Sequence, residues 1–280
     1  MKNAPLAALL ISLAATPVIA AETVGDDVIA DQRAALARNT DGAGFGPQAP
    51  RDIDVLGGTN TRAFSQAPAS SEMNLCNIHF HANAEHRGGD FTRFAGNGDG
   101  KGFGSGYAYA GTLTEAELAP LDRVIGDVGH GGLESGDTIE VHYVHTTAQV
   151  EPGPTLGACL SESISNPQLR VETQVYVLVN DPEAHDFVEL AAHGMVDGVH
   201  QALNIPETTG APVQYEGSTT GPGYNEKASP LQVSWSVRPR VAKVNIETVE
   251  TWLADNVFEE DHAHGVRNLV VNPALLSRID

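Results

Sequence analysis

The sequence has little positive charge and only two cysteines. Its 280 residues contain 16 Lys and Arg against 36 Asp and Glu, which gives a formal net charge of -20 at pH 7. A surface this acidic repels nucleic acid and anionic membranes and favours solubility, so we expect neither as a partner. Cys76 and Cys159 are the only cysteines, and an even pair of this kind predicts a disulfide if the chain is exported.

Long hydrophobic runs are missing outside the N-terminus. Lys2 precedes an apolar run over residues 6–15, and residues 17–21 offer small side chains for cleavage. This run is too short and wrongly flanked for a transmembrane helix. Residues 1–21 are therefore predicted to be a secretory signal peptide. The mature protein is predicted to be exported, periplasmic or secreted, with no membrane insertion after signal removal.

The chain also shows no internal repeat and no regular alternation of strands with crossover helices, which disfavours a parallel α/β fold. Residues 22–45 are predicted to be an N-terminal arm or linker with a short helix at 31–38, and residues 46–280 a single domain. The predicted fold is mostly β (α+β), with a central, largely antiparallel twisted sheet, long loops and a few short helices. Runs rich in Val, Ile, Tyr and Thr predict strands at 75–81, 107–113, 138–145, 170–179, 231–237 and 241–246, and helices are predicted at 114–125 and 247–256.

One predicted strand carries the sequence Asn77-Ile78-His79-Phe80-His81. Successive side chains of a strand alternate between its two faces, so His79 and His81 share a face with Asn77, and Ile78 and Phe80 take the other. Neutral imidazole is the commonest metal ligand, so this pair is typical of a metal site. Two half-buried, hydrogen-bonded histidines would give the same pattern, and the pair alone does not decide between them.

A second predicted strand adds a third histidine, because Glu140 and His142 share one of its faces. Zinc sites that do chemistry commonly keep three protein ligands and leave the fourth position to water. His79, His81 and His142 would supply such a set from two strands. A ligating histidine usually gives its other ring N–H to an oxygen acceptor, and Glu140 beside His142 and Asn77 beside His79 are placed for this role.

These residues resemble the signatures of a known family, the carbonic anhydrases. Three segments of this chain look like the zinc-strand signatures of the α-type enzymes: Asn-Ile-His-Phe-His at 77–81, Glu-His at 85–86 and Glu-Val-His-Tyr-Val-His at 140–145. Three further segments are similar to the family's Q-S-P segment, its Y-x-G-S-L-T-T-P-P loop and the strand after that loop: 48–53, 215–222 and 233–237. These segments follow the same order as in the family across roughly 46–240. The chain looks most like the δ-class, or carbonic-anhydrase-like, relatives.

The resemblance implies a fold like that of the α-type enzymes, Zn²⁺ as cofactor, and hydration of carbon dioxide to bicarbonate by attack of a zinc-bound hydroxide. It further implies a gatekeeper threonine that donates its hydroxyl proton to Glu85. The loop here reads Gly-Ser-Thr-Thr-Gly-Pro and departs from the family pattern. An ungapped match assigns the gatekeeper to Thr220, which we prefer, and a one-residue gap assigns it to Thr219. His86 and His145 match positions that are buried and structural in the family.

Two other functions fit part of the sequence. His79, His81 and Glu85 also match the H-x-H-x(3,4)-E pattern of cupin metalloenzymes, in which Glu85 and not His142 would bind iron or manganese. The second cupin half, P-x-G-x-x-H with a trailing Asn, is missing from the sequence. Eleven histidines and many carboxylates also fit a non-enzymatic periplasmic zinc-binding protein.

The sequence does not identify definite residues for the apolar wall or for the group that passes the proton to buffer. Ile78 and Phe80 face away from the metal, so the apolar wall for carbon dioxide is expected from Val144 or the neighbours of its strand. No histidine is identified as the group that passes the proton to buffer. His262 and His264 resemble a metal-binding pair, but a charged, solvated loop is the preferred interpretation.

Overall fold

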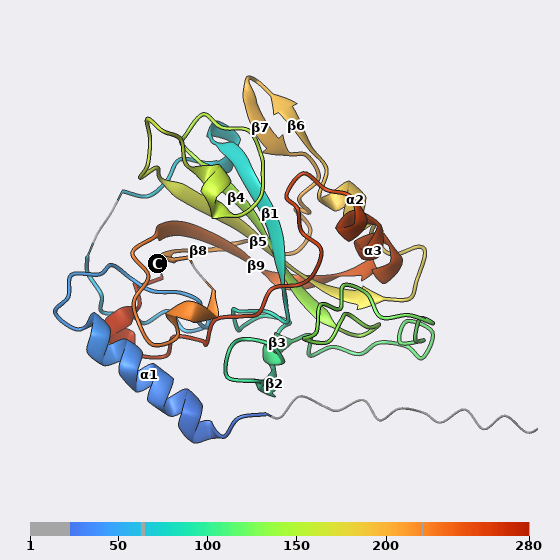
Figure 1. Ribbon diagram of the computed structural model, residues 1–280, viewed down its shortest axis with the longest axis horizontal. Coiled ribbons are helices and arrows are strands. Elements are labelled where there is room, and N and C mark those ends of the chain that lie inside the picture. The colour runs from blue at the N-terminus through green and yellow to red at the C-terminus, as the bar shows by residue number, and fades with distance from the viewer. Residues whose placement is uncertain (1–22, 63–64, 220, 280) are drawn as a thin grey trace, which may run out of the picture.

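The structure is a computed structural model that describes residues 23–62, 65–219 and 221–279 (Figure 1). The predicted signal peptide and Thr220, the preferred gatekeeper, lie outside the described residues. Within the described ranges, no helix is long and apolar enough to cross a membrane.

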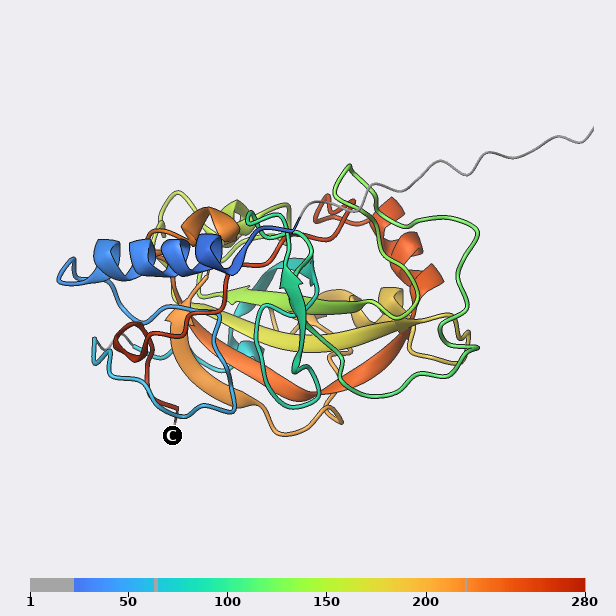
Figure 2. The same ribbon diagram turned by 90° about the horizontal axis from the view of Figure 1, so that it is seen from below.

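A five-stranded sheet forms the centre of the molecule, and Figure 2 shows how strongly its strands curve. Three of its neighbouring strand pairs are antiparallel and one, β5 with β9, is parallel. The predicted mostly-β fold with a largely antiparallel central sheet is therefore confirmed. In spatial order the strands are β1 (Asn74–Ala82), β4 (Thr138–Thr146), β5 (Leu169–Val179), β9 (Gln232–Asn245) and β8 (Val213–Ser218).

The other elements are short, apart from one helix near the N-terminus. That helix, α1, lies on the opposite side of the molecule from α2 and α3 in both ribbon views (Figures 1 and 2). Two further strand pairs are β2 (Arg93–Asn97) with β3 (Ser105–Ala108), and β6 (His193–Val196) with β7 (Val199–Ala202). The helices are α1 (Asp26–Thr40), α2 (Phe187–Leu190) and α3 (Ile246–Ala254), and the 3-10 turns are η1 (Ser70–Glu72), η2 (Leu156–Cys159), η3 (Pro222–Tyr224) and η4 (Pro273–Leu275).

The helix predicted at 114–125 is wrong. This segment forms turns, in which the backbone N–H of Leu118 donates to the carbonyl oxygen of Thr114. Pro120 follows two residues later, and a proline lacks the N–H and disfavours helical backbone at the residue before it. The segment therefore stops after a single turn.

The two strands predicted at 231–237 and 241–246 are one continuous strand, β9. Pro239 lies between the two predicted strands, and a proline cannot donate a hydrogen bond within a sheet. In the structure the pairing of β9 with β5 shifts register between Val237 and Val241, and Pro239 lies in that irregular stretch. A bulge thus accommodates the proline without ending the strand.

Helix α1 extends beyond the predicted 31–38 at both ends. Asp26 and Asp27 in its first turn and Arg38 in its last turn have the charges that stabilise the helix dipole. The side-chain amide of Gln32 donates to the carbonyl oxygen of Gly100 at 2.9 Å. Helix α1 therefore rests on the glycine-rich loop between β2 and β3.

The two faces of the sheet bury different apolar clusters. Ile78 and Phe80 of β1 pack in a core with residues of α2 and α3, such as Phe187. The opposite face packs a second core that includes Val144 and Trp235. The alternation read from the sequence therefore holds, and it leaves the imidazoles of β1 on the face opposite to Ile78 and Phe80.

Candidate metal centre

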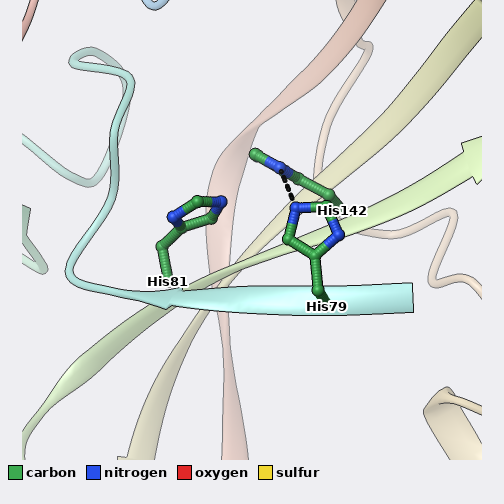
Figure 3. Close-up of side chains that lie close together, drawn as sticks. All are labelled: His79, His81 and His142. Atoms are coloured by element: carbon green, nitrogen blue, oxygen red, sulfur yellow. Dashed lines mark hydrogen bonds between the residues drawn. The ribbon is translucent and has the colours of Figure 1, made fainter. Parts of the chain in front are cut away.

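The register of β1 and β4 brings three histidines together. His79 lies directly opposite His142 in this antiparallel pair, and His81 lies opposite Glu140. Side chains directly opposite each other start about 5 Å apart at Cβ. The three imidazole centroids are 4.8 to 5.3 Å from one another, and Figure 3 shows the rings gathered above the two strands.

Two of these rings are oriented by the side chains that the sequence suggested. His79 Nδ1 lies 2.6 Å from Asn77 Oδ1, and His142 Nε2 lies 2.7 Å from Glu140 Oε1. The Asn77 amide nitrogen donates to the carbonyl oxygen of Gly153, so its oxygen is the atom that faces His79. Because each contacted atom is an acceptor, the ring nitrogen beside it carries the proton.

The third ring is oriented by a backbone carbonyl. His81 Nδ1 donates to the oxygen of Gly265 at 3.0 Å. This partner could not be predicted from the sequence, because every residue carries a carbonyl group. The result is nevertheless the same for all three histidines, since each has one protonated nitrogen in a hydrogen bond and one bare nitrogen.

The bare nitrogens point toward a common space. His79 Nε2 and His142 Nδ1 lie 3.2 Å apart, along the dashed line of Figure 3, and a nitrogen of His81 lies within 4.8 Å of both. No proton sits between two bare nitrogens of neutral rings, and a cation bound by both lone pairs would be stabilised there. A zinc ion bonded to each nitrogen at about 2.0–2.1 Å in tetrahedral geometry would space them about 3.3 Å apart. The spacing of the His79 and His142 nitrogens fits zinc, and the three imidazoles are a donor set that zinc takes.

Burial keeps the three imidazoles neutral. It lowers the pKa of His79 well below the ordinary value, with a further contribution from the charge of His142. It lowers the pKa of His81 to about 4 and also lowers that of His142, although the hydrogen bond from His142 to Glu140 acts in the other direction. Metal binding requires the neutral form of a histidine, so these shifts favour it.

Glu140 connects the site to a buried hydrogen-bond network. Its Oε1 accepts from His142 Nε2 and from His86 Nδ1, both at 2.7 Å, and the hydroxyl of Tyr215 donates to His86 Nε2 at 2.6 Å. Burial acts to raise the pKa of Glu140, but His86 and His142 outweigh it and hold this pKa well below its ordinary value. The grouping of His86, Glu140 and His142 is therefore a support for one ligand and not a second metal site.

A cavity of about 380 Å³ opens beside the three imidazoles. Glu85 and Thr219 both line it, and both are buried. The backbone N–H of Arg267 donates to Glu85 Oε1 at 2.8 Å, and burial raises the pKa of this carboxyl. The expected gatekeeper partner and one of the two candidate threonines thus lie around the same space.

The alternative ligand set with Glu85 is not assembled. Glu85 Oε1 lies 3.8 Å from His81 Nδ1, which is the nitrogen already bonded to Gly265. The group of convergent donor atoms contains His142 in place of Glu85. The geometry therefore disfavours the cupin arrangement.

His264 lies on the segment after α3 and forms an isolated bridge with His81 of β1. It lines the cavity, and its backbone N–H donates to the carbonyl oxygen of Phe80 in β1 at 2.9 Å. Its Nε2 lies 2.6 Å from Glu260 Oε2, and this hydrogen bond raises the pKa of His264. Its side chain is 41% exposed and lies outside the strands, so the interpretation as a charged, solvated loop stays a prediction, although sequence spacing did not reveal the pairing with β1.

The remaining expectations concern buried residues. Cys76 and Cys159 form a disulfide across 83 positions of sequence, as predicted. His86 and His145 are both buried, also as predicted. Val144, expected in the apolar wall, lies in the second core and is not among the residues that line the cavity.

Comparison with known proteins assigns the family. The sequence profile described as delta carbonic anhydrase matches residues 70–248, which is more than half of the chain. The chain belongs to the delta carbonic anhydrase family. The matched range holds both histidine strands and Thr219, so the carbonic anhydrase resemblance read from the sequence is confirmed. A search of curated proteins gives no match.

Solved carbonic anhydrases are also similar to this family member, at low TM-scores. An α-carbonic anhydrase of Photobacterium profundum shares 15% identity, covers 92% of this chain and 98% of its own, and has a TM-score of 0.29. One from Thermovibrio ammonificans, in complex with sulfanilamide, shares 16% over 80% of this chain and 84% of its own, with a TM-score of 0.27. A carbonic anhydrase from Chlamydomonas reinhardtii, in complex with acetazolamide, shares 17% identity over 83% of this chain and 89% of its own, with a TM-score of 0.27. The family assignment rests on the sequence profile and not on these scores.

Proposed function

We propose that this protein catalyses the zinc-dependent, reversible hydration of carbon dioxide to bicarbonate and a proton. The observation that carries the proposal is the convergence of three neutral imidazoles, each with one bare nitrogen, beside a cavity. A small uncharged substrate fits that cavity. The family assignment supports the same activity.

His79, His81 and His142 would hold the zinc ion. In carbonic anhydrase, the type case of this chemistry, zinc lowers the pKa of its water to about 7 and so supplies hydroxide at neutral pH. Asn77 and Glu140 serve the site by fixing which ring nitrogen of their partner is bare. Partners of this kind typically matter about 10- to 100-fold for metal affinity or activity.

Glu85 and one threonine of the 219–220 pair would orient the attacking oxygen. We propose Thr220 as the gatekeeper, with Thr219 as the alternative, and Glu85 as the acceptor of its hydroxyl proton. The support is that Glu85 and Thr219 line the cavity and that Glu85 is held in place by the backbone of Arg267. A buried carboxylate fixed in this way is a stationary acceptor.

We further propose that the protein works outside the cytoplasm, after removal of residues 1–21. The disulfide between Cys76 and Cys159 supports this proposal, since such bonds persist in oxidising compartments. Mass spectrometry of the mature N-terminus after expression in a secreting host would test the cleavage site.

Stopped-flow hydration of carbon dioxide by the zinc-loaded protein tests the proposed function. We expect turnover in the wild type and a loss of at least about 100-fold in His142→Ala, because loss of a partner of a ligand alone costs about 10- to 100-fold. His200→Ala is the matched control, since His200 belongs to β7 and does not line the cavity. Zinc binding without turnover in the wild type would instead favour a zinc-binding protein with no enzymatic activity.

A further inference from the structure

A second cavity lies beneath helix α1. Its volume is about 280 Å³, and its walls come from α1, from the β2–β3 hairpin and from the segment 267–269. Glu85 lines this cavity as well as the cavity beside the imidazoles, and among the described residues it is the only one that the two share. The second cavity, the α1 cavity, therefore reaches a side chain that the proposed function uses.

Arg33 of α1 brings a positive charge to the α1 cavity. Its Nε donates to the carbonyl oxygen of Leu269 at 3.2 Å, which anchors the side chain. In the part of the chain that the structure describes, the two terminal nitrogens of Arg33 have no hydrogen-bond partner. Arg33 is half-buried, and free guanidinium donors in a partly buried site favour an oxyanion, whose planar oxygens they match.

Tyr107 of β3 adds an uncharged donor to the same cavity. Within the described ranges its hydroxyl has no hydrogen-bond partner. Burial raises the pKa of Tyr107, so the hydroxyl keeps its proton, and the charge of Arg33 acts against this shift, so the two groups lie within electrostatic reach. The backbone of Tyr107 exchanges two hydrogen bonds with Ala84, at 2.7 and 2.8 Å. The phenol is therefore a donor on a wall that is attached beside Glu85.

The α1 cavity also contains a second cation and two carboxylates. Arg267 is almost fully buried, and its Nε has no hydrogen-bond partner among the described residues. Asp26 accepts from the side-chain amide of Asn97 at 2.8 Å, and Glu85 accepts from the backbone N–H of Arg267. The two arginines and the two carboxylates cancel in formal charge. A simple anion would be attracted by the first pair and repelled by the second.

We propose that the α1 cavity binds bicarbonate, at a site separate from the proposed zinc site. Bicarbonate is a small monovalent oxyanion that also carries an O–H group. Its charged oxygens can accept from Arg33 and Tyr107, while its O–H can donate to a carboxylate such as that of Glu85. Nitrate has the same charge and planar shape but no proton, so it would only be repelled by that carboxylate. The choice of ligand rests on the proposed function, which forms bicarbonate, but binding itself requires no turnover.

Isothermal titration calorimetry of the zinc-loaded full chain with sodium bicarbonate tests this proposal. We expect the affinity of the α1 cavity to fall about tenfold in Tyr107→Phe and at least as much in Arg33→Ala, the effect of losing a hydrogen bond to a charged group. Tyr109→Phe and Arg38→Ala are the matched controls, because they make the same chemical changes on side chains that do not line the cavity. Both should bind bicarbonate like the wild type. Binding at the zinc ion is common to all of these proteins, so the differences report on the α1 cavity.

Nitrate is the ligand control, and its Tyr107-dependent binding should be at least about tenfold weaker than that of bicarbonate. Wild-type affinity for bicarbonate in Tyr107→Phe would overturn the proposal. Nitrate binding as tight as that of bicarbonate would also overturn it, because the cavity would then hold an adventitious ion only. So would a loss confined to Arg33→Ala, since Arg33 would then act only by holding α1 in place. Absence of turnover in stopped-flow assays would instead reject the proposed function, so the two failures are distinguishable.

Discussion

At the scale of single residues, hydrogen-bond partners decide what the three histidines can do. Asn77 and Glu140 were predictable because each lies two positions from its histidine on the same face of a strand. The carbonyl of Gly265 and the backbone N–H of Arg267 were not predictable as partners, since every residue but proline carries both groups. The sequence therefore predicted two of the three partners that orient the histidines, and it predicted neither the partner of His81 nor that of Glu85.

His145 gives a pH dependence that can be measured. Burial lowers its pKa from 6.5 to about 4 in the folded protein. The unfolded chain therefore binds more protons between these values, and the free energy of unfolding should fall as the pH is lowered from 6.5 to 4. The loss is absent above the higher pKa and complete below the lower one, where it reaches on the order of 3 kcal/mol.

The measurement is chemical denaturation of the metal-free wild type and of His145→Gln across that pH range. The variant keeps a hydrogen-bonding side chain but does not titrate. The other buried histidines titrate in both proteins, so the difference between the two isolates His145. We expect this difference to change steadily between pH 6.5 and 4, and a difference that stays constant with pH would show the assignment to be wrong.

At the scale of elements, β1 carries most of what the site needs. It contains two proposed ligands, the amide that orients one of them and Cys76, which holds the segment 153–159. Strands such as β1 and β4 could be predicted because alternation and β-branched residues agree over their length. Strand β9 was predicted as two strands, whereas a bulge at Pro239 lets it continue. The helix predicted at 114–125 was wrong, because Pro120 follows its first turn.

The disulfide is expected to stabilise the fold as well as the cavity wall. It closes a loop across 83 positions, and in the chain-entropy model such a link contributes on the order of 4 kcal/mol. The Cys76→Ser/Cys159→Ser double variant should therefore lose about that much free energy of unfolding. Urea denaturation measures the loss, with Leu160→Ser as a reference change in the same segment. Equal stability of the double variant and the wild type would contradict this role.

At the scale of the whole molecule, residues far apart in the sequence meet at one cavity. Phe103, Leu156 and Pro222 come from three separate connections, and His264 joins the edge of β1 from near the C-terminus. Motifs and their order indicated the family, but they do not predict which loop side chains reach the cavity. The apolar wall was expected from Val144 or from the neighbours of its strand, and the structure places the Val144 side chain in the core.

The whole account depends on three imidazoles from two adjacent strands sharing one zinc ion. A crystal structure of the zinc-loaded, mature protein is the most direct measurement of that arrangement. We expect one zinc bound by His79, His81 and His142 at about 2.0–2.1 Å, with solvent in the fourth position. A zinc ion bound through Glu85 in place of His142, or one whose fourth position is filled by a protein atom, would contradict the account.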